Sequence, residues 1–153
     1  MLLTGTFARS IDEKQRIAIP KHFRDALTAS ASAPLYVAPG TDGSIWLYTE
    51  DALRRLADRL TDASPTREDV RAFSRLFYAR ASAVELDGQG RIRIPAELAQ
   101  FAEVERDAIL IGVQDHLEIW NPRRWDEYLQ ARQPRFDELA EAAFDRDRAK
   151  ADE

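Results

Sequence analysis

The sequence predicts a mainly β fold with helices (α+β), built from two copies of one unit that share an interleaved β-core. The first observation is a repeat. The segment from Ile11 to Pro20 recurs from Leu86 to Pro95, with an apolar residue, Asp, Arg, alternating Ile and Pro at matching places, which indicates two copies of one structural unit. The second observation is that each copy has short apolar segments separated by turn residues, as strands do. Because a single copy would leave an apolar strand edge exposed, we expect the two copies to pair across a pseudo-twofold axis.

The first unit contains two strands around a charged turn, then a helix and a hairpin. Polar and apolar residues alternate from Arg16 to Ile19, as in a half-buried strand. Pro20 lies where a short helix would begin, since proline is favoured in the first turn of a helix. Asp42-Gly43 is a typical hairpin turn, and Thr49 is placed to cap the next helix. The elements are expected at residues 2–9 (strand), 16–19 (strand), 21–27 (helix), and 35–38 and 45–48 (hairpin strands).

The second unit repeats that order. Between the units, residues 66–77 have apolar side chains at helical spacing, and Thr66 with Asp69 resembles a capping box. The second set is expected at 81–86 and 91–94 (strands), a short helix from Pro95, 109–113 and 117–120 (hairpin strands), and a helix from Asn121 through Tyr128. The predicted organisation is a first unit at 1–63, a connecting helix at 64–78, a second unit at 79–132, and a charged C-terminal helix or tail at 133–153.

Composition narrows the class of protein. A chain of 153 residues that is 44% hydrophobic can bury a core. It has no cysteine, which excludes disulfides and Cys-ligated metals. His22 and His116 are not at metal-ligand spacing, so no metal site and no cofactor are predicted. Neither a signal peptide nor an apolar segment of membrane-spanning length is present in the sequence, and we expect a cytoplasmic protein.

Charge is unevenly distributed along the chain. The net charge of −5 would by itself argue against nucleic acid, because phosphate binding depends on Lys and Arg. Residues 1–25, however, hold five basic and three acidic side chains, whereas residues 134–153 hold seven acidic and four basic ones. A basic patch on an acidic protein is therefore expected around the first turn.

The two Asp-x-x-x-Arg turns are the candidate functional site. Arg16 and Arg91 are the natural candidates for contact with bases, because a guanidinium offers a fork that matches guanine or phosphate. Asp12 and Asp87, four residues earlier, are expected to accept hydrogen bonds from turn amides or to orient the arginine. Additional cations for contact with DNA are Arg9, Lys14, Lys21 and Arg24 in the first copy and Arg93 in the second. Viewed alone, such a turn is more often a structural ion pair, and it is the duplication that favours a functional site.

These turns, each followed by an alternating strand and Pro, resemble the swapped-hairpin fold of SpoVT/AbrB-type domains. Two such units in one chain, opening with a strand that contains Thr4-Gly5 and including Leu117-Glu118-Ile119-Trp120, resemble the MraZ family of bacterial transcriptional regulators. The resemblance covers about residues 1–130. It implies sequence-specific binding to double-stranded DNA with repeated short boxes, at the promoter of the division and cell-wall gene cluster that includes the protein's own gene. It also implies a ring-like homo-oligomer associated with the nucleoid.

One position departs from the family pattern. Gly90 precedes Arg91, but Gln15 precedes Arg16, and glutamine is strained where glycine is not if the turn needs positive φ. The first copy is nevertheless favoured for DNA contact, because its surroundings are more basic.

The sequence is compatible with two other classes of function to different degrees. An antitoxin-like protein-interaction module of the same fold would use its tail to bind a toxin, but Phe136 and Phe144 lie in a helix-prone acidic tail that better suits subunit packing. An enzyme is not predicted, because no nucleophile and base constellation is present in the sequence.

Overall fold

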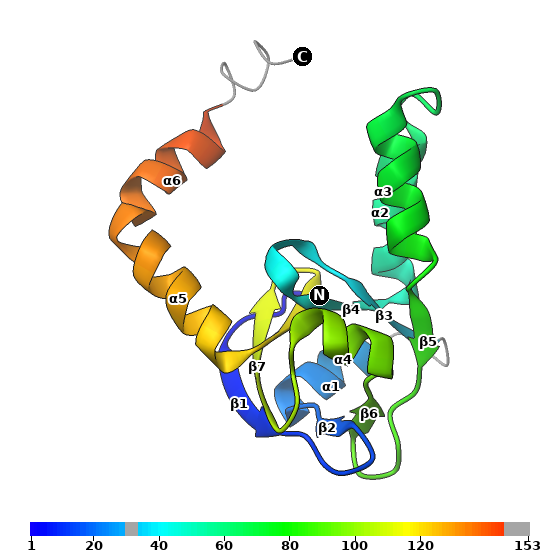
Figure 1. Ribbon diagram of the computed structural model, residues 1–153, viewed down its shortest axis with the longest axis vertical. Coiled ribbons are helices and arrows are strands. Elements are labelled where there is room, and N and C mark those ends of the chain that lie inside the picture. Colours follow the sequence, from blue (N-terminus) through cyan, green and yellow to red (C-terminus); the bar gives the residue numbers. More distant parts are fainter. Residues whose placement is uncertain (30–33, 146–153) are drawn as a thin grey trace. The chain divides into compact units, whose positions relative to one another are not determined.

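Figure 1 shows the computed structural model of the chain, which describes residues 1–29 and 34–145. The chain divides into two compact units, Met1–Asn121 and Pro122–Glu153. The first unit contains β1 (Thr6–Ser10), β2 (Arg16–Ala18), α1 (Lys21–Thr28), β3 (Leu35–Pro39), the 3-10 turn η1 (Thr41–Gly43), β4 (Ile45–Thr49), α2 (Glu50–Thr61), α3 (Glu68–Tyr78), β5 (Ser82–Val84), β6 (Arg91–Arg93), α4 (Ala96–Ala102), β7 (Asp107–Val113) and β8 (His116–Trp120). The second contains α5 (Pro122–Arg132), the 3-10 turn η2 (Gln133–Arg135) and α6 (Phe136–Phe144).

The large sheet is antiparallel and confirms the interleaved core. Its strand order is β1-β7-β8-β4-β3-β5. The first strand of each repeat therefore pairs with the hairpin of the other repeat, β1 with β7 and β5 with β3. If each strand is replaced by its counterpart in the other repeat, the same order results, read from the opposite edge. The central pair is β4 with β8, and Trp46 lies opposite Glu118 at the pseudo-twofold axis. Neither repeat can complete this sheet without the other.

A second, two-stranded sheet joins the two motif strands. We call β2 and β6 the ribbon. Ile17 pairs with Ile92 at its centre, and both side chains are buried. Alternation along each strand places their neighbours on the opposite face. Helices α1 and α4 lie between the ribbon and the large sheet (Figure 1), where Phe23 and Leu98 join the isoleucines in one hydrophobic core.

Local chemistry explains where elements begin and end. The first strand is shorter than predicted because Gly5 has φ +101°, which interrupts extended backbone. Thr49 caps α2 as predicted, since its hydroxyl accepts a hydrogen bond from the Ala52 amide at 3.1 Å. The predicted capping box before α3 is wrong. Asp69 accepts instead from the Arg67 guanidinium and the Val70 amide, and Arg67 rather than Thr66 occupies the N-cap.

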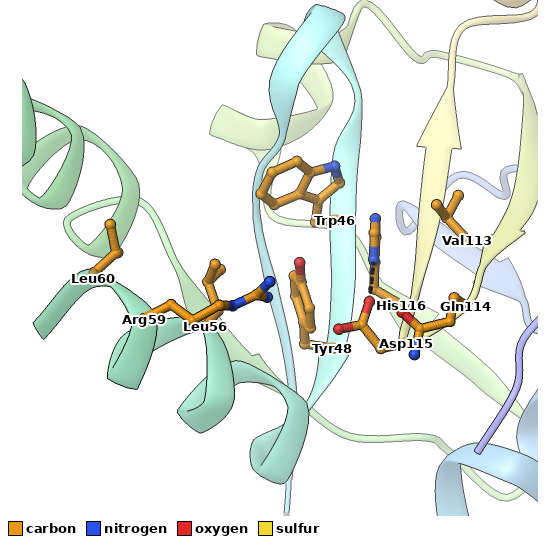
Figure 2. Close-up of a pocket in the computed structure, with 9 residues that line it drawn as sticks. All are labelled: Trp46, Tyr48, Leu56, Arg59, Leu60, Val113, Gln114, Asp115 and His116. Carbon is orange, nitrogen blue, oxygen red and sulfur yellow. Dashed lines mark hydrogen bonds and ion pairs between the residues drawn. The ribbon is translucent and has the colours of Figure 1, made fainter. Parts of the chain in front are cut away.

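A polar cluster occupies the centre of the large sheet. The Glu118 carboxylate bonds to three rings: it accepts from Trp46 Nε1 at 3.1 Å and Trp120 Nε1 at 2.9 Å, and it contacts His116 Nε2 at 3.0 Å. The other imidazole nitrogen contacts Asp115 Oδ1 at 2.9 Å, and the Tyr48 ring stacks on the imidazole with centroids 5.0 Å apart (Figure 2). Of the two tryptophans in this cluster, Trp120 is buried and Trp46 is half-buried.

This cluster makes stability dependent on pH. Burial of the imidazole opposes its protonation, but hydrogen bonds to Glu118 and Asp115 outweigh it and raise the pKa of His116. Burial also opposes ionisation of Glu118, yet hydrogen bonds from His116 and Trp120 lower its pKa. Burial raises the pKa of Tyr48 to about 12, so this ring stays neutral. The His116 contribution is present below its unfolded pKa of about 6.5 and is lost as pH rises through the higher folded value.

We therefore expect the free energy of unfolding to fall between about pH 6 and pH 9. His116→Gln should flatten this dependence, because the imidazole that titrates is gone. Urea denaturation at both pH values measures the effect, with His22→Gln as control because His22 is exposed on α1. An equally steep decline in His116→Gln would contradict the assignment.

Candidate nucleic-acid interface

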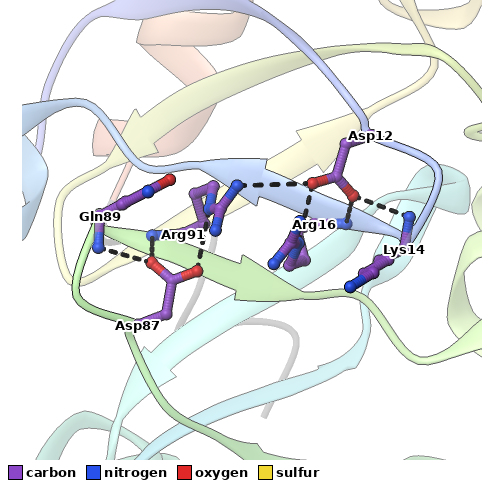
Figure 3. Close-up of polar contacts among 6 residues, drawn as sticks. All are labelled: Asp12, Lys14, Arg16, Asp87, Gln89 and Arg91. Carbon is purple, nitrogen blue, oxygen red and sulfur yellow. Dashed lines mark hydrogen bonds and ion pairs between the residues drawn. The ribbon is translucent and has the colours of Figure 1, made fainter.

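The first turn is organised by one carboxylate. Asp12 Oδ1 accepts hydrogen bonds from the backbone amides of Lys14 and Arg16, both at 2.9 Å (Figure 3). The second oxygen, Oδ2, accepts from Arg16 Nε at 2.8 Å. Aspartate suits this position because its short side chain can reach amides two and four residues ahead. The carboxylate therefore fixes the turn backbone and the direction of the Arg16 side chain together.

The second turn has the same arrangement. Asp87 Oδ1 accepts from the amides of Gln89 and Arg91 at 2.9 Å, and Oδ2 accepts from Arg91 Nε, also at 2.9 Å (Figure 3). In both turns the amide of the arginine is the main reason that the aspartate pKa lies below its usual value, with further amide and guanidinium donors adding to it. Both carboxylates are therefore ionised at neutral pH.

The two turns form one continuous site. Arg91 Nη1 lies 3.6 Å from Asp12 Oδ2, so the guanidinium of the second turn also contacts the carboxylate of the first. The backbones are joined as well: the Ile94 amide donates to Gln15 O at 2.8 Å, and the Ile19 amide donates to Gly90 O at 2.9 Å. Each turn is thus anchored on the strand of the other repeat.

Gln15 has the left-handed backbone that its repeat partner suggested. Its φ is +63°, close to the +76° of Gly90, so both turns take the same shape. Side chains differ around them. A Cβ at Gly90 would lie 2.5 Å from Arg24, whereas the position equivalent to Arg24 in the second repeat is Ala99. The turn that faces the large Arg24 side chain therefore has glycine at this position. The other turn, whose counterpart of Arg24 is the small Ala99, has glutamine.

Gln15→Gly is expected to stabilise the protein by about 1 kcal/mol. Glycine removes the steric cost of left-handed backbone, and the substitution also removes a buried Gln15 Oε1 that has no hydrogen-bond partner among the described residues. Thermal or urea unfolding measures the change. Gln89→Gly, at an exposed turn position without positive φ, is the control and should not stabilise. A loss of stability in Gln15→Gly would show that the side chain, not the backbone, matters there.

The outward face of the ribbon carries three arginines. Arg16 lies opposite Arg93, and Arg91 lies opposite Ala18, in the register that buries Ile17 and Ile92. The side chains of Arg16 and Arg91 are 29% and 25% exposed, so both are reachable while held by their aspartates. Like charges directly opposite each other in a sheet are destabilising. Their presence on so short a ribbon is more consistent with an anionic partner than with stability.

The remaining predicted cations are placed differently. Lys14 lies exposed at the tip of the first turn, and Lys21 is exposed at the start of α1. Arg9 lies on edge strand β1, with its guanidinium bonded to Ala8 O and 5.6 Å from the Phe7 ring centroid. Arg24 is half-buried next to Gly90, and its Nε has no hydrogen-bond partner within the described part of the chain.

Gln89 was missed as a candidate from sequence. It occupies the position in the second turn that Lys14 occupies in the first, and it is exposed. A glutamine amide can bond to a base edge, adenine above all. The sequence signal for Gln89 is its alignment with Lys14 when the two repeats are compared position by position.

Comparison with known proteins agrees with the repeat. The family model described as "MraZ protein, putative antitoxin-like" matches the chain twice, at residues 2–76 and 77–147. The chain belongs to the MraZ family. It is 40% identical over 141 residues to "Transcriptional regulator MraZ" of Lactiplantibacillus plantarum, covering 92% of this chain and 97% of that protein. It is 36% identical over 146 residues to the protein of that name from Natranaerobius thermophilus, covering 95% and 99% of the two chains.

Both copies of the Asp-ordered arginine turn lie within the two stretches that the MraZ family model matches. Within residues 1–29 and 34–145, no group of three His, Cys, Asp or Glu side chains could hold a metal ion. None of the described helices is long and apolar enough to cross a membrane. The feature that both MraZ repeats share is instead the Asp-ordered arginine turn.

Proposed function

We propose that this protein is a sequence-specific DNA-binding transcriptional regulator acting at the promoter of the division and cell-wall gene cluster that includes its own gene. The observation that supports it best is the ribbon, on which three arginines face outward from a buried Ile17–Ile92 pair. The names of its relatives support a transcriptional regulator. The promoter and the gene cluster are what the family resemblance implies. The same proposal includes that the protein is cytoplasmic, associated with the nucleoid and not an enzyme.

The geometry of the ribbon suits the major groove. That groove admits a two-stranded β-ribbon, and an arginine can bond in bidentate fashion to guanine O6 and N7. Arg16 and Arg91 are the proposed base-contacting residues, with Lys14 and Gln89 at the turn tips. Because Asp12 and Asp87 already orient the arginines, less side-chain freedom is lost on binding. Arg93, Lys21, Arg9 and Arg24 are proposed to contact or attract phosphates, which position the protein without specifying sequence.

A single ribbon offers few contacts, and we propose that assembly supplies the rest. A ring-like homo-oligomer would present several ribbons to repeated short DNA boxes. Linked binding events raise overall affinity strongly when all sites can be engaged together. Selectivity would then depend on the spacing of the boxes as well as on their sequence.

Binding should be strongly salt-dependent. If four phosphates are neutralised, raising salt from 50 to 200 mM should weaken affinity by about 100-fold, because the slope of log affinity against log salt is about −0.9 per phosphate contact. Fluorescence anisotropy on DNA from upstream of the protein's own gene measures this, with scrambled DNA of equal length as control. Equal affinity for both DNAs would overturn sequence-specific regulation, and a flat salt response would point to a protein partner.

An antitoxin-like interaction module is the second candidate. The observation in its favour is that Phe136 and Phe144 of α6 are 69% and 85% exposed, so this helix has an apolar face available to a partner. Folded protein that binds no upstream DNA would place this candidate first.

A further inference from the structure

Helix α6 has an exposed apolar face. Phe136, Leu139 and Phe144 are 69%, 40% and 85% exposed, and with Ala140 and Ala143 they follow the i, i+3, i+4, i+7, i+8 spacing of an amphipathic helix. No residue of α6 is buried. A helix with this pattern usually lies with its apolar face against another surface, as in helix-in-groove recognition.

The α2–α3 hairpin offers a groove of suitable character. The groove has a volume of about 530 Å³ and lies between the two helices, with apolar walls that include Leu60, Val70 and Tyr78. Arg71 and Arg75 of α3 form its charged edge. Among the described residues that line the groove, none is acidic. An occupant with apolar and acidic side chains would therefore match it.

The charges on the two helices also match in spacing. Arg71 and Arg75 are four residues apart on α3, and Asp137 and Glu141 are four residues apart on α6. Residues at this spacing lie one above the other on a helix, about 6 Å apart along its axis. Each acid also lies next to a residue of the apolar stripe, because Ala140 is three residues after Asp137 and Phe144 is three residues after Glu141. Two ion pairs could form side by side when Phe136 or Phe144 enters the groove.

We propose that α6 of one copy of this chain docks in the α2–α3 groove of a second copy, with Asp137 and Glu141 facing Arg71 and Arg75. This inference rests on the proposed homo-oligomer and names the surfaces that would build it. Every copy carries both the helix and the groove, so the contact is head-to-tail. Repeated contacts of that kind close into a ring when the rotation between copies permits closure.

Charge reversal tests the contact. Arg71→Glu with Arg75→Glu is the groove variant, and Asp137→Arg with Glu141→Arg is the helix variant. Each variant alone should raise, at least tenfold, the protein concentration at which half of the oligomer dissociates. Size-exclusion chromatography with light scattering over a dilution series measures that concentration. The four changes combined in one chain, or the two variants mixed in equal amounts, should restore assembly because opposite charges face each other again. Glu105→Arg with Arg106→Glu, at exposed positions between α4 and β7, is the control and should assemble like the wild type.

A second pair of changes tests the apolar part. Phe136→Ser with Phe144→Ser should weaken assembly even at 1 M salt, where ion pairs are screened. Thermal unfolding of every variant confirms that it is folded. The proposal is overturned if the folded groove and helix variants assemble like the control, if the combined variant is not restored, or if mixing fails where combination succeeds, since that would mean docking within one chain. If the variants assemble like the wild type and still bind the upstream DNA selectively, the α6 contact is wrong and the proposed function stands. If the assembled wild type shows no selectivity for that DNA, the proposed function is wrong.

Discussion

Replacing both Arg16 and Arg91 with alanine is expected to lower affinity for the upstream DNA by about 100-fold or more. Each bidentate contact between arginine and a base contributes about 1–3 kcal/mol of discrimination, and an assembly repeats the loss in every subunit. Each single variant should lose part of this affinity, because each keeps one of the two base-contacting arginines. The two turns act as one site, since Arg91 contacts the aspartates of both. Anisotropy titration at fixed salt measures the three variants beside the wild type.

The control for this prediction is Arg55→Ala, which removes an exposed cation from α2 without touching the ribbon. It should change affinity little. The double turn variant should unfold like the wild type, since the amide hydrogen bonds that Asp12 and Asp87 accept do not need the guanidinium groups. Wild-type affinity in the double variant would mean that the turns are structural ion pairs.

Trp120→Ala should destabilise the protein by about 3–5 kcal/mol, the usual cost of truncating a large buried aromatic. Its ring is 3% exposed, and its Nε1 donates to Glu118 at the centre of the large sheet. The substitution therefore leaves a cavity and removes one of the hydrogen-bond partners of the half-buried Glu118 carboxylate. Urea denaturation at pH 6 measures the change in free energy of unfolding.

Trp125→Ala provides the comparison. This tryptophan lies on α5, is half-buried, and stacks on Tyr128 with ring centroids 5.8 Å apart. Its loss should cost clearly less than that of Trp120. Similar small effects from both substitutions would show that the polar cluster at the sheet centre does not anchor the fold.

The duplicated motif predicted the main feature of the fold. Because each half alone has unpaired apolar strands, pairing across a pseudo-twofold axis followed from the sequence, and the β2–β6 and β4–β8 pairs confirm it. The positive φ of Gln15 was also foreseeable from alignment with Gly90. Repeats carry this information because one copy reports on the conformation of the other.

Features created by contacts between distant segments were not predictable. Arg24 packs next to Gly90 across the two repeats, and no local pattern marks that approach. The convergence of Trp46, His116 and Trp120 on Glu118 depends on strand register. The capping box before α3 failed for a local reason, because Arg67, two residues before Asp69, binds the Asp69 carboxylate. The unit boundaries at residues 63 and 79, and the DNA-contacting role of every turn residue, stay predictions.

Hydroxyl-radical footprinting on the DNA upstream of the protein's own gene is the most direct test of the account. Wild-type protein should protect short boxes at regular spacing, and the Arg16→Ala, Arg91→Ala double variant should protect none of them at the same concentration. Protection that is uniform along the DNA, or that is identical for the double variant, would contradict the claim that paired arginine turns select the sequence.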